Sequence, residues 1–248
     1  MIKVKTRSNQ TGQKLAQKTL REISQPDQPQ CQSRSWQDPE GYRFLVAWSN
    51  AVLLRFLIRL FTDFLPKSEY RRKAQVDDAA RSVVRNIEEG YKRATTSEYL
   101  QFIGYSQGSL EEVKGDVREM TEDGFLKSRP GSGLAGLGIN LGDFNQALRG
   151  NKGTSRKLED IKGKVKESKG GYNQAESSKF IYRPLISLYP PLKILKPQDL
   201  TIEIFMELIN KTDWNLRKLV WSLEKKLAAD QKGYQIEKAR MRSNLKFK

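Results

Sequence analysis

The chain has 248 residues and carries 45 lysines and arginines against 29 acidic residues, a formal net charge of +16. This excess favours a polyanionic partner, either nucleic acid or an acidic lipid surface. The sequence has no histidine, which excludes Ser-His-Asp and Cys-His catalysis, histidine-bearing zinc sites and di-iron sites built on Glu-x-x-His. A single cysteine, Cys31, and an N-terminus without an apolar signal core predict a reduced, cytoplasmic protein.

The N-terminal region is polar and basic. Residues 1–35 hold seven lysines and arginines against two acidic residues, and they include Pro26 and Pro29. A segment with so few apolar side chains cannot bury enough surface to offset the entropy lost on ordering. We therefore predict that residues 1–40 form a basic, mostly disordered arm.

The most apolar run is Phe44–Leu65. A membrane span is the alternative interpretation, but Arg55, Arg59 and Asp63 lie inside the run, and each would cost roughly 2.5–3.5 kcal/mol at the middle of a bilayer. We therefore predict a buried helix of a bundle. Its apolar side chains go well round the cylinder, which favours a second contact and hence self-association. The candidate interface residues are Trp48, Val52, Phe56, Leu60 and Phe64.

Residues 73–120 predict two helices joined by a short turn, an antiparallel hairpin. Apolar residues recur at three- and four-residue steps in both. Gly90 suits a left-handed cap at the end of the first helix, and Thr95 with Glu98 has capping-box spacing at the start of the second. Gly104 and Gly108 predict a groove for close backbone approach. The two apolar stripes are Val76, Ala80, Val83 and Ile87, then Tyr99, Ile103, Ser106, Leu110, Val113, Val117 and Met120.

The first helix of this hairpin and its turn are rich in cations. Arg81 and Arg85 are one turn apart, so their guanidinium groups point the same way. Two interpretations stay open: phosphate contact, or ion pairing with Asp77, Asp78, Glu88 and Glu89. The candidate nucleic-acid-binding residues here are Arg71, Arg72, Lys73, Arg81, Arg85, Lys92 and Arg93.

Composition changes over residues 127–197, where Gly, Ser, Lys and Asn dominate and helical periodicity fades. Residues 131–136 match G-x-G-x-x-G, but no strand pattern precedes them, so a flexible loop is favoured over a dinucleotide site. Lys152–Lys169 predicts a mobile cationic loop, whereas residues 185–195 are apolar enough to dock on the helices. The candidate phosphate-binding residues of the loop are Arg156, Lys157, Lys162, Lys164 and Lys166.

Helical periodicity returns after residue 197, and we predict a fourth helix over residues 198–229 followed by a basic tail over 230–248. Trp214, Val220 and Trp221 widen its apolar face. The predicted fold is all-α: an up-down four-helix bundle with helices 1–3 in residues 41–126, a long basic insertion at 127–197 and flexible basic termini. The apolar run of the fourth helix is Phe205, Leu208, Thr212, Leu216, Leu219, Leu223 and Leu227.

The positive charge is unevenly distributed. Residues 36–126 have thirteen basic and fifteen acidic side chains, whereas residues 127–197 have fourteen and five, and residues 198–248 have eleven and seven. The first three helices are thus near neutral, and the excess lies on the arm, the insertion and the last segment. Mobile cationic segments bind a polyanion by releasing its counterions, with little sequence preference.

Six short segments within residues 42–126 form a combined pattern. They are Val46-Ala47-Trp48, Phe64-Leu65-Pro66, residues 78–83 (DAARSV), residues 86–90 (NIEEG), residues 97–102 (SEYLQF) and residues 108–112 (GSLEE). Together they resemble the four-helix-bundle family that includes proteins encoded in ribosomal-RNA intervening sequences and the accessory variability determinant (Avd) of diversity-generating retroelements. The long basic additions to the minimal pattern depart from that family.

The resemblance implies a non-enzymatic protein. In the Avd branch it implies a pentameric ring that binds a reverse transcriptase and template RNA and supports mutagenic copying. The chain has no Tyr-x-Asp-Asp polymerase motif, so the partner would perform the copying. The alternative is a general nucleic-acid-binding bundle of the intervening-sequence type without a reverse transcriptase partner.

Two further interpretations are weaker. Acidic residues could form a metal-carboxylate site of an enzyme, but adjacent acidic pairs on a helix point apart and have basic neighbours. Membrane-surface binding lacks an amphipathic helix that couples the basic segments to an apolar face. No pattern indicates a cofactor or a metal. The acidic residues considered were Asp77, Asp78, Glu88, Glu89, Glu111, Glu112 and Asp116.

Overall fold

The computed structural model describes residues 38–150 and 185–245. Within these ranges the secondary structure is helical, apart from one isolated bridge between Lys127 and Thr201. This confirms the all-α prediction. The predicted N-terminal arm up to residue 37, Cys31 and the cationic loop Lys152–Lys169 lie outside the described residues.

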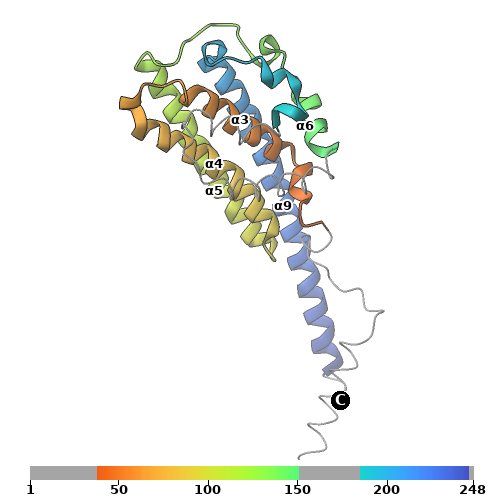
Figure 1. Ribbon diagram of the computed structural model, residues 1–248. Helices are drawn as coiled ribbons and strands as arrows, with labels where there is room; N and C mark the ends of the chain where they lie inside the picture. The colour runs from red at the N-terminus through yellow and green to blue at the C-terminus, as the bar shows by residue number, and fades with distance from the viewer. Residues whose placement is uncertain (1–37, 151–184, 246–248) are drawn as a thin grey trace, which may run out of the picture.

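Five α-helices of the described ranges carry the architecture (Figure 1). Short 3-10 helices connect them: η1 (Gly41–Phe44), η2 (Lys67–Glu69), η3 (Leu134–Leu137), η4 (Pro190–Lys193) and η5 (Pro197–Asp199). The α-helices are α3 (Val46–Thr62), α4 (Tyr70–Lys92), α5 (Thr96–Glu122), α6 (Leu141–Gly150) and α9 (Ile202–Leu245).

The four longest helices contact one another in a closed cycle. Helix α4 packs against α3 and α5, and α9 packs against the same two helices from the other side (Figure 1). One apolar core runs between them. The ring of Phe61 on α3 meets that of Phe205 on α9 edge to face, with centroids 6.1 Å apart. These contacts bury the apolar stripe of each helix, as amphipathic helices require.

The predicted hairpin is α4 and α5. All residues of its two predicted stripes are buried. Thr95 and Glu98 form the predicted capping box: the Thr95 hydroxyl accepts from the Glu98 N–H at 3.1 Å, and the Glu98 carboxylate accepts from the Thr95 N–H at 3.2 Å. The box satisfies two of the N–H groups that a helix start leaves unpaired.

The prediction for Gly90 is wrong. Helix α4 continues to Lys92, and Gly90 is not among the glycines with positive φ. The residue is small because α5 passes close by: a Cβ at position 90 would lie 2.8 Å from the Phe102 Cβ and 2.8 Å from the Tyr99 ring. Gly104 and Gly108 are exposed, and a Cβ there would meet nothing within 4 Å, so no backbone of the described residues uses the predicted groove. The close approach occurs one helix earlier in the chain.

Helix α3 uses its wide apolar surface within the chain. Besides α4 and α9 it contacts α6, η1 and η5, and the Ser49 hydroxyl on α3 donates to the Asn145 side chain on α6. This coverage accounts for most of the apolar surface of α3, and self-association stays a prediction. Trp48 and Phe56 are only 8% and 4% exposed, Val52 and Leu60 are partly buried, and Phe64 is 59% exposed.

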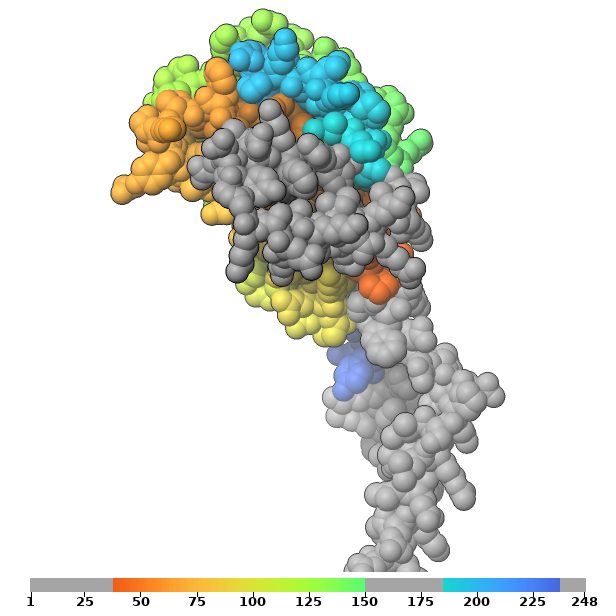
Figure 2. Space-filling model, viewed as in Figure 1, coloured from red at the N-terminus to blue at the C-terminus, as the bar shows by residue number. Residues whose placement is uncertain are grey.

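Residues 127–150 and 185–200 are ordered, contrary to the flexible loop predicted at residues 131–136. They contribute buried side chains to the core, and the rings of Phe144 and Tyr189 pack edge to face with centroids 5.4 Å apart. The predicted docking of residues 185–195 is confirmed. The two segments share one end of the molecule (Figure 2). Their buried apolar residues are Leu134, Ile139, Phe144, Leu148, Leu185, Tyr189, Leu192 and Leu200.

Helix α9 is longer than predicted, because it continues through most of the expected tail to Leu245. Its later part extends past the other helices (Figure 1), and residues 228–236 are exposed all round. Trp214 and Trp221 also face outward, although the sequence pattern placed them on the apolar side. None of the described helices combines the length and the apolarity needed to cross a bilayer.

The Gly90 contact makes a paired prediction. Gly90→Ala forces a methyl group against the Tyr99 and Phe102 side chains, so we expect it to lower the free energy of unfolding by about 1–3 kcal/mol. Gly104→Ala adds the same methyl group to an open helix surface and is expected to raise it by about 0.5–1 kcal/mol. Urea unfolding followed by circular dichroism measures both, and equal effects would contradict the close approach.

Candidate nucleic-acid interface

The described candidate cations fall into two groups by their direction. At 3.6 residues per turn, Arg71, Arg81, Arg85 and Lys92 lie within about a quarter of the circumference of α4. Their side of the helix faces away from the core, and all four are exposed. We call these four residues the α4 cation strip. Arg72 and Lys73 lie on other sides of the helix.

Arg72 and Lys73 join elements at the start of α4. The Arg72 guanidinium pairs with Asp123 after α5 at 2.7 Å and with Glu69 at 3.5 Å, and it lies 5.3 Å from the Phe125 ring centroid. The Lys73 ammonium pairs with Asp63 at the end of α3. Both charges are used within the chain, so these two sequence candidates belong to the scaffold rather than to an open phosphate site.

Arg81 and Arg85 form ion pairs but also remain open to solvent, so their positions agree with both ion pairing and phosphate contact. Arg85 pairs with Glu88 at 3.0 Å and Arg81 approaches Asp78 at 3.9 Å, yet each side chain is 59% exposed. Both side chains of the Arg81–Asp78 pair are exposed, and such a pair contributes about 0–1 kcal/mol, whereas Glu88 of the other pair is only 17% exposed. A phosphate with several oxygens can therefore replace Asp78 as the partner of Arg81 at small cost.

Aromatic rings hold the cations at the α4–α5 turn. The Arg93 guanidinium lies 4.2 Å from the Phe102 ring centroid, and the Lys92 ammonium lies 5.8 Å from that of Tyr42. Such contacts orient a cation without neutralising its charge. Arg93 follows the end of α4 and sits beside the strip. The remaining sequence candidates, Arg156, Lys157, Lys162, Lys164 and Lys166, lie outside the described residues.

The acidic residues weighed as a metal site are dispersed. Asp77 accepts from Arg59 at 2.7 Å and from Thr62 at 2.9 Å, and Asp116 accepts from Gln75 at 2.8 Å. Glu88 accepts from the Trp48 indole N–H at 3.1 Å. Burial raises the pKa of the Asp77 and Asp116 carboxyls. Across residues 38–150 and 185–245 no group of three or more such side chains could hold a metal ion.

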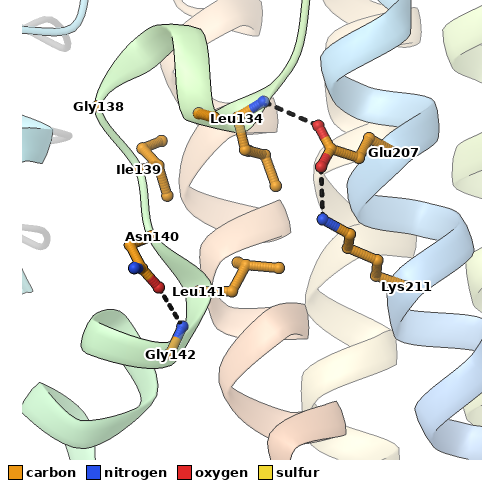
Figure 3. A pocket seen from close by; sticks show the side chains of 9 residues that line it. Leu134, Gly138, Ile139, Asn140, Leu141, Gly142, Glu207 and Lys211 are labelled. Carbon is orange, nitrogen blue, oxygen red and sulfur yellow. Dashed lines mark hydrogen bonds and ion pairs between the residues drawn. The ribbon is translucent and has the colours of Figure 1, made fainter.

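The G-x-G-x-x-G stretch binds a carboxylate of the chain itself. Its Leu134 N–H donates to Glu207 on α9 at 2.8 Å, and Lys211 donates to the same carboxylate (Figure 3). Gly131 and Gly138 have φ of +83° and +70°, which favours glycine in these turns. The hollow beside them has a volume of about 440 Å³. With Glu207 on its wall, this hollow does not present the backbone donors that a phosphate would need.

A second carboxylate of α9 ties the same segment. Glu203 accepts from the Ser128 hydroxyl and, at 3.0 Å, from the Arg129 N–H. Burial acts to raise the pKa of Glu203, but these hydrogen bonds outweigh it and lower the pKa to about 2. The same holds for Glu207: burial acts to raise its pKa, but hydrogen bonds from Lys211 and Leu134 outweigh burial and lower it. The pair fastens residues 128–134 to the start of α9.

Sequence reasoning missed a set of surface residues on α9. Trp214 and Trp221 are 56% and 66% exposed, the Lys218 ammonium lies 3.7 Å from the Trp214 ring centroid, and the Lys225 ammonium lies 5.5 Å from that of Trp221. The steps of four, three and four residues place all four on one side of the helix. We call this set the α9 tryptophan–lysine stripe. The spacing is visible in the sequence, but helical periodicity assigns both tryptophans to the apolar face of the helix.

Part of the chain matches a known protein family. Residues 43–134 match the family model of the 23S rRNA-intervening sequence protein. The matched segment contains α3, α4 and α5 and therefore the α4 cation strip, whereas α6 and α9 lie beyond it. No curated protein and no solved structure matches the chain. The match covers 92 of the 248 residues, which is less than half of the chain.

The Glu203 and Glu207 contacts make a pH prediction. A carboxyl whose pKa is lowered on folding contributes stability above its unfolded value, 4.5, and loses it as pH falls toward the folded value, about 2 for Glu203. We expect Glu203→Gln to be less stable than the wild type at pH 7, and the difference to shrink as pH falls from 4.5 to 2.

Urea midpoints at a series of pH values measure this difference. Glu122→Gln, at an exposed position on α5, is the control and should follow the wild-type curve. A difference between Glu203→Gln and wild type that stays constant across the acid range would contradict the assignment.

Proposed function

We propose that the protein is a non-enzymatic nucleic-acid-binding protein. One observation carries the proposal: the exposed α4 cation strip lies within the segment that matches a family named after an intervening sequence of 23S rRNA. The net charge of +16 agrees with a polyanionic ligand.

The binding chemistry follows from how the cations are held. Arg71, Arg81, Arg85 and Lys92 follow one side of a 23-residue helix, where they outnumber the exposed Asp78 and Glu89 that share it, and they present donors to a phosphate backbone. Contacts of this kind position the strand and carry no sequence information. Each phosphate neutralised releases counterions, so affinity should fall steeply as salt rises.

The narrower form of the proposal is an accessory protein of a diversity-generating retroelement. The residue patterns at 46–48, 64–66, 78–83, 86–90, 97–102 and 108–112 resemble the family that includes Avd, and together with the positive charge they support this form. In this form an up-down four-helix bundle assembles into a pentameric ring in the cytoplasm. The ring binds template RNA and the reverse transcriptase, which performs the mutagenic copying.

A ring needs exposed apolar surface between its subunits. Trp48 and Phe56 are buried within the chain, so the interface would use the part of the original candidate set that stays accessible, Phe64 above all. Tyr70, the first residue of α4, is also exposed. The interface proposed here therefore lies at that end of the hairpin.

Removing two charges from the strip tests the primary proposal. We expect the Arg81→Ala and Arg85→Ala double variant to bind a structured RNA more weakly than wild type and to lower the slope of log K against log salt by about two. The matched control, Arg118→Ala with Arg129→Ala, removes two exposed arginines outside the strip. Fluorescence anisotropy at several salt concentrations measures both, and equal effects would place binding elsewhere.

Affinity purification of the full chain from its native cells separates the two forms of the proposal. Recovery of a reverse transcriptase with a structured RNA supports the retroelement form. Recovery of RNA without a polymerase supports the general RNA-binding form. If the purified protein binds no RNA even at low salt, both forms fail.

A further inference from the structure

We propose that the α9 tryptophan–lysine stripe is a binding site for single-stranded nucleic acid, on which unpaired bases stack while the lysines contact the adjoining phosphates. This deepens the proposed function by naming a second surface and the class of strand it takes. The stripe lies on α9, beyond the segment that matches the family. It therefore adds a contact that the matched helices do not contain.

The exposure of the two indoles is unusual for side chains of this size. A tryptophan is largely buried in most folded proteins, yet more than half of both Trp214 and Trp221 is accessible. The opposite side of α9 is firmly packed, since Leu216 and Leu223 are buried in the core. The rings are thus presented to solvent by a helix that cannot rotate to bury them.

The two lysines give the stripe its charge. Across the described residues no carboxylate pairs with Lys218 or Lys225, and the partner of each ammonium is an indole ring. Arg217 differs, because Asp213 binds it at 2.8 Å. A cation–π contact leaves the full positive charge available. A strand whose base meets the indole brings its phosphate to the same ammonium, which reaches it by rotating its own side chain.

The spacing suits an extended strand. Seven residues of helix separate the two indoles by about 10 Å along the axis, whereas a stacked strand advances roughly 3.4 Å per nucleotide. Two bases a few nucleotides apart can therefore stack on the two rings at once. Bases in a duplex hide their faces in the stack, so the stripe should prefer unpaired strands.

Charge argues against a second copy of the chain as the occupant. A symmetric contact through the same stripe would gather Lys218 and Lys225 of both copies, four ammonium groups without an acidic residue in the stripe to offset them. Like charges brought together at an interface oppose association. An anionic ligand with flat apolar groups matches both components of the stripe.

The test uses the full chain with fluorescein-labelled 20-nucleotide oligo(U) and oligo(dT), measured by anisotropy. We expect the Trp214→Ala and Trp221→Ala double variant to bind at least about tenfold more weakly, and the corresponding Phe double variant to stay close to wild type. The Leu double variant keeps apolar area without an aromatic ring, so it should resemble the Ala variant. Far-ultraviolet circular dichroism confirms that each variant keeps its helix content.

A second pair of variants separates local contact from total charge. Lys218→Ala with Lys225→Ala should weaken binding and reduce the salt slope by about 1.4, the value for two phosphate contacts on a single strand. The control, Lys67→Ala with Lys193→Ala, removes two exposed lysines away from α9 and should change affinity less. Tyr105→Ala removes an exposed ring from α5 and should have no effect.

Three outcomes would overturn the inference. One is wild-type affinity in the Trp→Ala variant while wild type itself binds, which leaves the proposed function standing and places binding elsewhere. Another is wild-type affinity in the Leu variant, which indicates apolar contact without stacking. The third is a halved molar mass of the Trp→Ala variant by light scattering, which assigns the stripe to a second copy. Failure of wild-type protein to bind any nucleic acid would instead contradict the proposed function.

Discussion

Helix α3 is apolar around most of its circumference, and it can be stable in water only if every side is covered. Helices α4 and α9 cover two sides, and α6 with η1 and η5 covers much of the remainder. This requirement explains why the Gly-rich segment after α5 folds back: it brings Phe144 and Leu148 to the uncovered side. The carboxylates of Glu203 and Glu207 then hold residues 128–134 in place.

The parts of the fold that depend on local pattern were predictable from the sequence. The buried stripes of α4 and α5 and the Thr95–Glu98 box follow from spacing alone. The cap predicted at Gly90 is wrong because a tertiary contact requires the glycine there: the missing side chain makes room for Tyr99 and Phe102. The order of residues 131–150 was missed for the same kind of reason, since that segment gains its stability from α3 and α9 and shows little periodicity of its own.

The candidate site was predictable only in part. The sequence identified the cations of α4, but the assignment of Arg72 and Lys73 to scaffold ion pairs depends on where Asp123 and Asp63 lie in space. Periodicity assigns Trp214 and Trp221 to the apolar side of α9 because it shows which residues share a side of a helix. It does not show how far the neighbouring helices extend to cover that side. The structure thus separates cations that hold helix ends together from cations that remain open to a ligand.

The exposed part of α9 should open locally more readily than the part packed in the core. Residues 228–236 are exposed all round, so tertiary contacts add little to their backbone hydrogen bonds, and isolated helical turns are marginal in water. Amide protons there should exchange with solvent far faster than those near Phe205 and Leu208, which open only when the whole core does. Helix α9 is therefore continuous in structure but has two dynamic regions: a stable packed part near Phe205 and Leu208, and an exposed part that opens locally.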